Sequence, residues 1–163
     1  MTELKIGITL PTIGEIETLG GIDAAACHVE ELGFESVWAA DLIVGDGTPS
    51  LESTIALALA AAVTERVHVG FSVLVLPLRP PAWAAAQIQT LQHVSGGRVI
   101  LGIGSGGFPG ASFWQAVGGP ARGRGRMTDA ALDVPPPYTG LRPLECCQCP
   151  WIPARPSSLS RIT

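Results

Sequence analysis

The strongest constraint in this sequence is the regular spacing of four apolar, β-rich segments. They begin near residues 5, 35, 67 and 98, at intervals of 30, 32 and 31 residues. Parallel strands need a crossover connection, and one strand–helix unit takes about this many residues. A (β/α)₈ barrel of ~250 residues divides into units of ~31 residues, so the spacing matches a barrel. A doubly wound sheet has similar units, and the period alone does not choose between the two.

Hydrophobic periodicity predicts alternating strands and helices. Gly33 follows the first helix at the position of a left-handed C-terminal cap. Thr48 and Pro49 form the pattern of a helix start, with Thr48 as the N-cap. The predicted strands cover residues 5–10, 35–40, 67–76 and 98–103, and the predicted helices cover 22–32, 48–64, 80–93 and 121–134. These elements predict an α/β fold with a parallel sheet.

The composition favours one globular domain and excludes several classes of protein. Of 163 residues, 47% are hydrophobic and 15% are charged, which excludes disorder over the whole chain. The net charge of −4 offers no basic surface for nucleic acid. The apolar run at residues 53–64 is shorter than the ~20 residues that a bilayer needs, and the first residues lack a signal-peptide pattern. We therefore expect a cytoplasmic protein with no nucleic-acid or membrane partner.

The last part of the chain differs from the rest. Four prolines lie between Pro143 and Pro156, which excludes a regular helix or central strand there. We therefore divide the chain into a folded unit at residues 1–134 and an irregular tail at residues 135–163. The tail contains the cysteine motif CCQC, but no histidine follows His93 and the spacing is not that of a zinc site. No metal is expected.

Candidate chemistry lies at the carboxyl ends of the predicted strands, where parallel α/β folds bind ligands. Asp41 follows the second strand, where it either hydrogen-bonds a cofactor, orients a neighbouring group or caps the loop. The glycine-rich segment GIGSGG at residues 102–107 follows the fourth strand. Its amides and the Ser105 hydroxyl are suited to a phosphate, and a tight turn without a ligand is the alternative. It also matches GxGxxG, a weak signal because Pro109 follows instead of a helix.

Structural roles are predicted for the other charged and titratable side chains. His28 is expected to lie in solvent and His68 at the end of its strand away from the ligand site. His93 ends a helix, where an imidazolium complements the helix dipole. The arginines of the RGRGR motif at residues 122–126 are interpreted as a solvated helix face in preference to a phosphate site.

Four segments carry more specific motifs: KIGITLP, EELGFESVWAAD, AAVTERVHVGFSVLVLPLRPP and LQHVSGGRVILGIGSGGFPG. Together with RGRMTDAALDV they resemble the luciferase-like monooxygenase family over about residues 4–134. That family comprises flavin- and deazaflavin-dependent oxidoreductases on a TIM-barrel scaffold of eight units. The resemblance implies that this chain supplies four of the eight, as the N-terminal half of a barrel that looks truncated.

The resemblance also implies which residues contact the cofactor, which would be FMN or coenzyme F-420. Ser72 and Val73 fall where many members have a non-prolyl cis peptide, in a bulge behind the flavin ring. Gly104, Ser105 and Gly106 fall in the loop that contacts the phosphate or the ring of the cofactor.

Departures from the family pattern leave the acid–base chemistry unassigned. Asp41 matches an acid that is often followed by a histidine linked to proton or hydride chemistry, and Leu42 stands in that position here. Gly107 replaces a glutamate found in some members. No general acid or base is therefore named.

The leading hypothesis is an oxidoreductase that performs hydride transfer or monooxygenation on a small organic substrate. The first alternative is a non-catalytic remnant that forms a homo-oligomer. The apolar helix at residues 49–64 suggests a dimer face, and the outer strands of a half-barrel would be exposed edges. The second alternative is a Rossmann-type NAD-dependent enzyme, which rests on GIGSGG.

Overall fold

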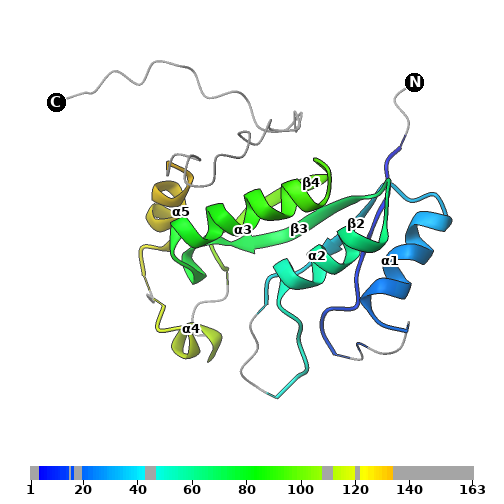
Figure 1. The fold of residues 1–163 in the computed structure, drawn as a ribbon. Coiled ribbons are helices and arrows are strands. Elements are labelled where there is room, and N and C mark those ends of the chain that lie inside the picture. The colour runs from blue at the N-terminus through cyan, green and yellow to red at the C-terminus, as the bar shows by residue number, and fades with distance from the viewer. Residues whose placement is uncertain are drawn as a thin grey trace.

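The strands of the described chain form one four-stranded parallel sheet (Figure 1). The computed structural model describes residues 4–14, 16, 20–42, 47–107, 112–119 and 122–133. The strands are β1 (Gly7–Thr9), β2 (Ser36–Ala39), β3 (His68–Val75) and β4 (Val99–Gly104). Each pairs in parallel with the next strand in the chain. The predicted α/β fold and all four predicted strands are confirmed.

The order of the strands distinguishes a barrel from a doubly wound sheet. A doubly wound sheet reverses its strand order at a switch point and carries helices on both faces. The described strands instead run β1-β2-β3-β4 without a reversal. Three helices lie side by side along one face of the sheet (Figure 1), namely α1 (Ile22–Glu31), α2 (Ser53–Val63) and α3 (Pro81–Val94). The sheet is therefore part of a (β/α) barrel, and it lacks the reversed strand order that the Rossmann-type alternative requires.

The core lies between the sheet and these helices. Val37, Val69 and Val99 occupy one row across β2, β3 and β4, and all three side chains are buried in the same cluster as residues of the helices. The opposite face carries Trp38, whose indole ring lies over Gly70 of the neighbouring strand. A Cβ atom on Gly70 would lie 2.6 Å from the ring, so glycine is required beneath it.

The first helix ends as predicted. Gly33 has a φ of +84°, the left-handed conformation that only glycine adopts at little cost. Its N–H donates to the carbonyl of Glu30 at 3.1 Å, and the N–H of Phe34 donates to the carbonyl of Val29 at 3.2 Å. These bonds satisfy carbonyls that the helix end leaves without intrahelical donors. The chain then leads directly into β2.

The predicted start of the second helix is wrong by several residues. The helix α2 begins at Ser53, and its N-cap is Glu52, whose carboxylate accepts from the N–H of Ile55 at 2.8 Å. Thr48 and Pro49 precede the helix because this segment is engaged elsewhere. The carbonyl of Pro49 accepts from Gly14, and the N–H of Leu51 donates to the carbonyl of Thr12. A contact between loops outweighs the local helix signal here.

The remaining elements follow β3 and β4. A short 3₁₀ helix, η2 (Leu76–Leu78), was not predicted, nor was α4 (Ser112–Ala116). The last described helix is α5 (Arg124–Leu132), within the predicted stretch. None of the helices in the described part of the chain is long and apolar enough to cross a membrane. The irregular tail predicted at residues 135–163 lies outside the described residues.

Candidate functional site

The candidate residues gather at the carboxyl ends of β2, β3 and β4. Asp41 follows β2, Ser72 and Val73 lie within β3, and Gly104 ends β4. Ser105 and Gly106 continue directly from Gly104. Because the strands are parallel and adjacent, these residues share one rim of the sheet. The structure therefore brings together candidate residues that lie in separate segments of the sequence.

The strand β3 is irregular at Ser72 and Val73. Its pairing with β4 shifts register between Phe71 and Leu74, and the peptide bond between Ser72 and Val73 is cis. This is the position at which the resemblance to the luciferase-like family implies a cis peptide. Both side chains leave the core, and Val73 is 42% exposed. The bulge thus presents an apolar side chain at the rim.

Two glycines of β4 accommodate this bulge. A Cβ on Gly104 would overlap the Cγ2 methyl of Val73, and a Cβ on Gly102 would overlap the carbonyl oxygen of Phe71. Glycine is therefore required at both positions by contact within the sheet. Val73 lies against the backbone of Gly102 and Gly104, which carries no side chains, and we call these three residues the Val73 surface.

The loop after β4 divides into a packed residue and two open ones. Gly106 has a φ of +73°, and a Cβ there would overlap the ring of Trp114. Ser105 is exposed, and among the described residues no atom lies within 4 Å of a Cβ position on Gly107. The backbone and hydroxyl that remain available to a ligand in this loop are therefore those of Ser105 and Gly107.

Asp41 is buried and makes four hydrogen bonds. Its Oδ2 accepts from Nη1 of Arg79 at 2.6 Å and from the N–H of Val75 at 2.8 Å. Its Oδ1 accepts from Nη2 of Arg79 at 2.8 Å and from Oγ of Ser53 at 2.9 Å. The hydrogen bonds from Arg79 to Asp41 raise the pKa of this guanidinium above its ordinary value. The sequence left three roles open for Asp41: binding a cofactor, orienting a neighbouring group or capping the loop. These contacts are those of a residue that orients neighbouring groups.

Arg79 is a residue for which the sequence patterns predict no role. The signal that indicates its pairing is the position of two opposite charges: Asp41 ends one apolar strand segment, and Arg79 follows the next one directly before Pro80. Carboxyl ends of adjacent parallel strands lie together, so such charges are expected to meet.

A small apolar cluster lies beside the rim. Trp114 of α4 and Val75 are buried against each other, with the less buried Leu42, Leu78 and Val117 around them. The guanidinium carbon of Arg124 lies 4.5 Å from the centroid of the Trp114 ring, a cation–π contact. Leu42, which replaces the histidine of the family pattern, is thus part of an apolar patch that has no proton to transfer. Trp114 also was not singled out from the sequence.

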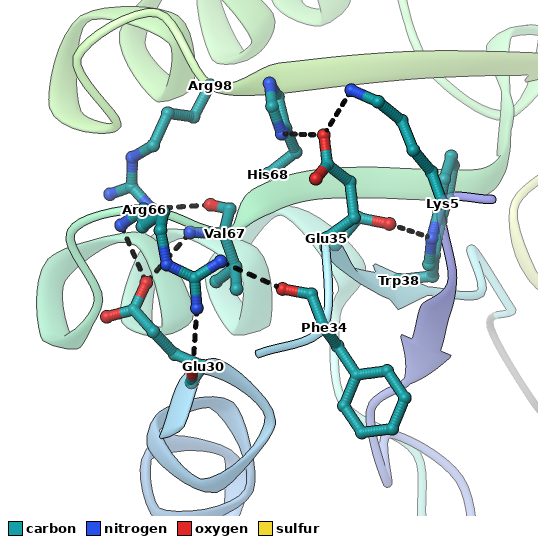
Figure 2. A network of polar contacts seen from close by, with 10 residues as sticks. Lys5, Glu30, Phe34, Glu35, Trp38, Arg66, Val67, His68 and Arg98 are labelled. Atoms are coloured by element: carbon teal, nitrogen blue, oxygen red, sulfur yellow. Dashed lines mark hydrogen bonds and ion pairs between the residues drawn. The ribbon is translucent and has the colours of Figure 1, made fainter. Parts of the chain in front are cut away.

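A second polar network lies at the opposite ends of the strands (Figure 2). The carboxylate of Glu30 accepts from the N–H groups of Glu65, Arg66 and Val67 at 2.6–3.0 Å. Desolvation opposes the charge of Glu30, but these hydrogen bonds hold the pKa of this carboxyl below its ordinary value. The network joins the end of α1 to the start of β3, away from the candidate residues.

The histidines of the described chain lie outside the rim. His28 is exposed, with Nδ1 3.8 Å from Glu31. His68 starts β3, with Nδ1 3.7 Å from Glu35, which also binds Lys5 (Figure 2). His93 lies in the last turn of α3. Within the described ranges, no group of three or more potential ligands is placed to hold a metal ion.

The family comparison gives a match over most of the chain. The model of the family described as luciferase-like monooxygenase matches residues 5–134. An uncharacterized protein of Mycobacterium tuberculosis is 37% identical over 89 residues, which cover 55% of this chain and 30% of that protein. The 4-hydroxyprotoasukamycin monooxygenase of Streptomyces nodosus is 34% identical over 65% of this chain and 28% of its own length. An F-420-dependent glucose-6-phosphate dehydrogenase of Amycolatopsis mediterranei is 41% identical over 50% of this chain and 26% of its own length.

Solved structures share the fold. The oxygenating constituent of 3,6-diketocamphane monooxygenase from Pseudomonas putida, in complex with FMN, has a TM-score of 0.63 at 21% identity. The match covers 80% of this chain and 38% of that one. An F-420-dependent secondary alcohol dehydrogenase has a TM-score of 0.63 at 23% identity, over 80% of this chain and 40% of that one. The chain thus spans less than a third of the length of the curated relatives named above.

Proposed function

We propose that this chain, which belongs to the luciferase-like monooxygenase family, forms the cofactor-holding part of an oxidoreductase barrel. The proposed cofactor is reduced FMN or coenzyme F-420, and the proposed substrate is a small organic molecule. One relative is named as F-420-dependent, and one solved structure of the same fold contains FMN. Hydride transfer involving the deazaflavin is the first proposal for the reaction, and monooxygenation with a flavin is the second.

The Val73 surface is the observation that carries this proposal. A flavin or deazaflavin ring is flat, with apolar faces and polar nitrogen and oxygen atoms around its edge, so one face can rest on a small apolar side chain and on backbone. Val73 is 42% exposed. Beside it, on the neighbouring strand β4, Gly102 and Gly104 have no side chain that could project toward the ring. The residues present therefore fit the ring, with Ser72 and Val73 proposed beneath it.

The loop after β4 fits the polar end of the cofactor. We assign Gly104, Ser105 and Gly106 to this end, with the Ser105 hydroxyl and the open backbone at Gly107 as donors to a phosphate. Gly106 contributes a left-handed turn, at a position where the ring of Trp114 leaves no room for a Cβ. Asp41 binds the backbone of Val75, two residues beyond Val73, as well as Arg79 and Ser53.

The cofactor supplies the redox chemistry when it is bound, and the protein orients it and shields it from water. Among the described residues of the rim, Asp41 and Arg79 are paired with each other, and Leu42 lies in an apolar patch. We therefore assign this chain the tasks of binding and orientation, and we assign no acid or base.

Titration of the purified chain with each cofactor tests the proposal. We expect saturable binding of FMN or of F-420, followed by fluorescence, at concentrations on the order of tens of micromolar. The variant Val73→Glu places a charge on the ring surface and should abolish binding. The variant Val94→Glu is the matched control, because Val94 is also an exposed valine, 49% accessible, but ends α3. No binding of either cofactor by the unaltered chain would refute the proposal.

A homodimer is the second proposal, and it does not require catalysis. Ile55, Leu59 and Val63 are exposed on α2 at spacings of four residues, so they form an apolar stripe on one side of the helix. Such stripes mark contact surfaces with other proteins.

We also propose that residues 1–134 form the folded unit and that the protein acts in the cytoplasm.

A further inference from the structure

We propose that Asp41 and Arg79 are positioning residues, which hold the Val73 surface in the arrangement that the cofactor ring requires. This proposal rests on the proposed function. It gives Asp41 and Arg79 a role in cofactor binding that acts through their neighbours, without contact between either side chain and the cofactor.

The connection to the Val73 surface runs through Val75. The N–H of Val75 donates to Oδ2 of Asp41 at 2.8 Å. Val75 lies two residues beyond Val73 and pairs with Gly104, the glycine that Val73 covers. The regular pairing of β3 with β4 is interrupted between Phe71 and Leu74. The hydrogen bond to Asp41 therefore fixes β3 at Val75, immediately after the segment in which its pairing with β4 is interrupted.

Arg79 fixes the orientation of the Asp41 carboxylate. Nη1 and Nη2 of Arg79 bind the two carboxylate oxygens separately, at 2.6 and 2.8 Å, and such a two-pronged pair has one geometry. The side chains of Arg79 and Asp41 are only 11% and 2% exposed. Nη2 also lies 3.5 Å from Glu52, so both terminal nitrogens are directed at carboxylates of the protein.

Three connections of the rim meet at this carboxylate. Asp41 belongs to the loop after β2, Ser53 is the first residue of α2, and Arg79 follows η2. A buried ion pair adds little net stability compared with apolar residues of the same volume, because desolvation offsets the attraction. This pair fixes the positions of the three connecting segments relative to one another. We therefore expect its loss to change the affinity for the cofactor.

The opposite end of the sheet provides a matched control. Glu30 also joins two elements by accepting backbone N–H groups, including that of Val67 at 2.8 Å. It is exposed to more solvent and lies away from the rim. A variant of Glu30 therefore tests whether any lost carboxylate anchor weakens cofactor binding through a general loosening of the fold.

The experiment compares Asp41→Asn, Arg79→Met, Arg79→Lys and the control Glu30→Gln in the full chain. For each variant, the dissociation constants for F-420 and FMN are measured with the fraction of folded protein, and amide hydrogen exchange is followed at Val75 and Val67. We expect Asp41→Asn and Arg79→Met to weaken binding by about ten- to a hundredfold, the effect of losing a charged hydrogen bond. Exchange at Val75 should accelerate in these variants while Val67 is unchanged.

The remaining variants separate positioning from charge. Arg79→Lys keeps the charge but loses the two-pronged geometry, so it should bind nearly as weakly as Arg79→Met. Glu30→Gln should accelerate exchange at Val67 and leave both dissociation constants within about twofold of the unaltered chain. Unchanged affinity in folded Asp41→Asn and Arg79→Met, or full rescue by Arg79→Lys, would overturn the positioning role alone. No binding by the unaltered chain would instead refute the proposed function on which it rests.

Discussion

The side chain of Val73 lies directly over Gly104, so closely that a Cβ on residue 104 would overlap the Cγ2 methyl of Val73. The two residues come from neighbouring strands, β3 and β4, and their contact shapes the surface to which we assign the cofactor ring. Glycine at position 104 is thus explained by packing within the sheet.

Substituting Gly104 tests this contact. Gly104→Ala must displace Val73 or the backbone of β4, and forcing a methyl into such a site costs about 1–3 kcal/mol of unfolding free energy. We expect this loss in urea denaturation, together with weaker cofactor binding. Gly107→Ala is the control, because a Cβ at Gly107 meets no atom of the described residues within 4 Å, and it should change stability by less than about 0.5 kcal/mol. Equal stability of the two variants would contradict the packing observed.

The carboxylate of Glu30 predicts how stability depends on pH. Its folded pKa lies below the ordinary value because it accepts hydrogen bonds from Glu65, Val67 and Arg66. Its contribution is therefore complete above the unfolded pKa of about 4.3 and disappears as the pH falls through the folded pKa. We expect Glu30→Gln to be less stable than the unaltered chain at neutral pH, with the difference shrinking in acid. Urea unfolding at a series of pH values measures this, and a difference that grows in acid would contradict it.

Arg98 predicts a large effect on stability. Its side chain donates to the carbonyl groups of Ala61, Thr64, Val67 and Ser95 at 2.7–2.8 Å, and so satisfies carbonyls at the end of α2. Arg98→Met should cost about 2–4 kcal/mol of unfolding free energy, since these acceptors lose a charged donor. The exposed Arg126 is the comparison, and Arg126→Met should alter stability by less than about 0.5 kcal/mol. A similar small effect for both arginines would be inconsistent with this capping role.

The apolar stripe on α2 predicts the oligomeric state. Leu59 lies at the middle of the stripe, between Ile55 and Val63. If this stripe is the dimer contact that we propose, Leu59→Asp should convert a dimer into a monomer in sedimentation velocity experiments. Leu32→Asp is the control, because Leu32 is also an exposed leucine, 61% accessible against 45% for Leu59, but lies at the C-cap of α1 and outside the stripe. Dissociation by Leu32→Asp, or a dimer that survives Leu59→Asp, would place the contact elsewhere.

The strands and the first helix were predictable from the sequence because their signals are local. Apolar runs and the left-handed glycine at position 33 depend on neighbours along the chain, and the structure confirms both. The start of α2 was not predictable in this way. Pro49 and Leu51 bind the loop at Thr12 and Gly14, a contact that no local pattern encodes.

The candidate site was predicted in position but not in its contacts. Asp41, Val73 and Gly104 do lie on one rim, which follows from parallel strands of equal spacing. The pairing of Asp41 with Arg79 and the packing of Trp114 against Gly106 depend on the relative positions of separate loops. Spacing along the chain does not contain that information, and cofactor contact by Val73 and Gly104 stays a prediction.

The most direct test of the account is the location of the cofactor ring in the bound state. With methyl-labelled valines, nuclear Overhauser effects between ring protons and individual methyl groups can be measured at saturating F-420 or FMN. We predict strong effects to the Val73 methyls, and none to Val69, which is buried on the helix-covered face of the same strand. A saturated complex in which the ring protons contact other methyl groups and not those of Val73 would contradict the account.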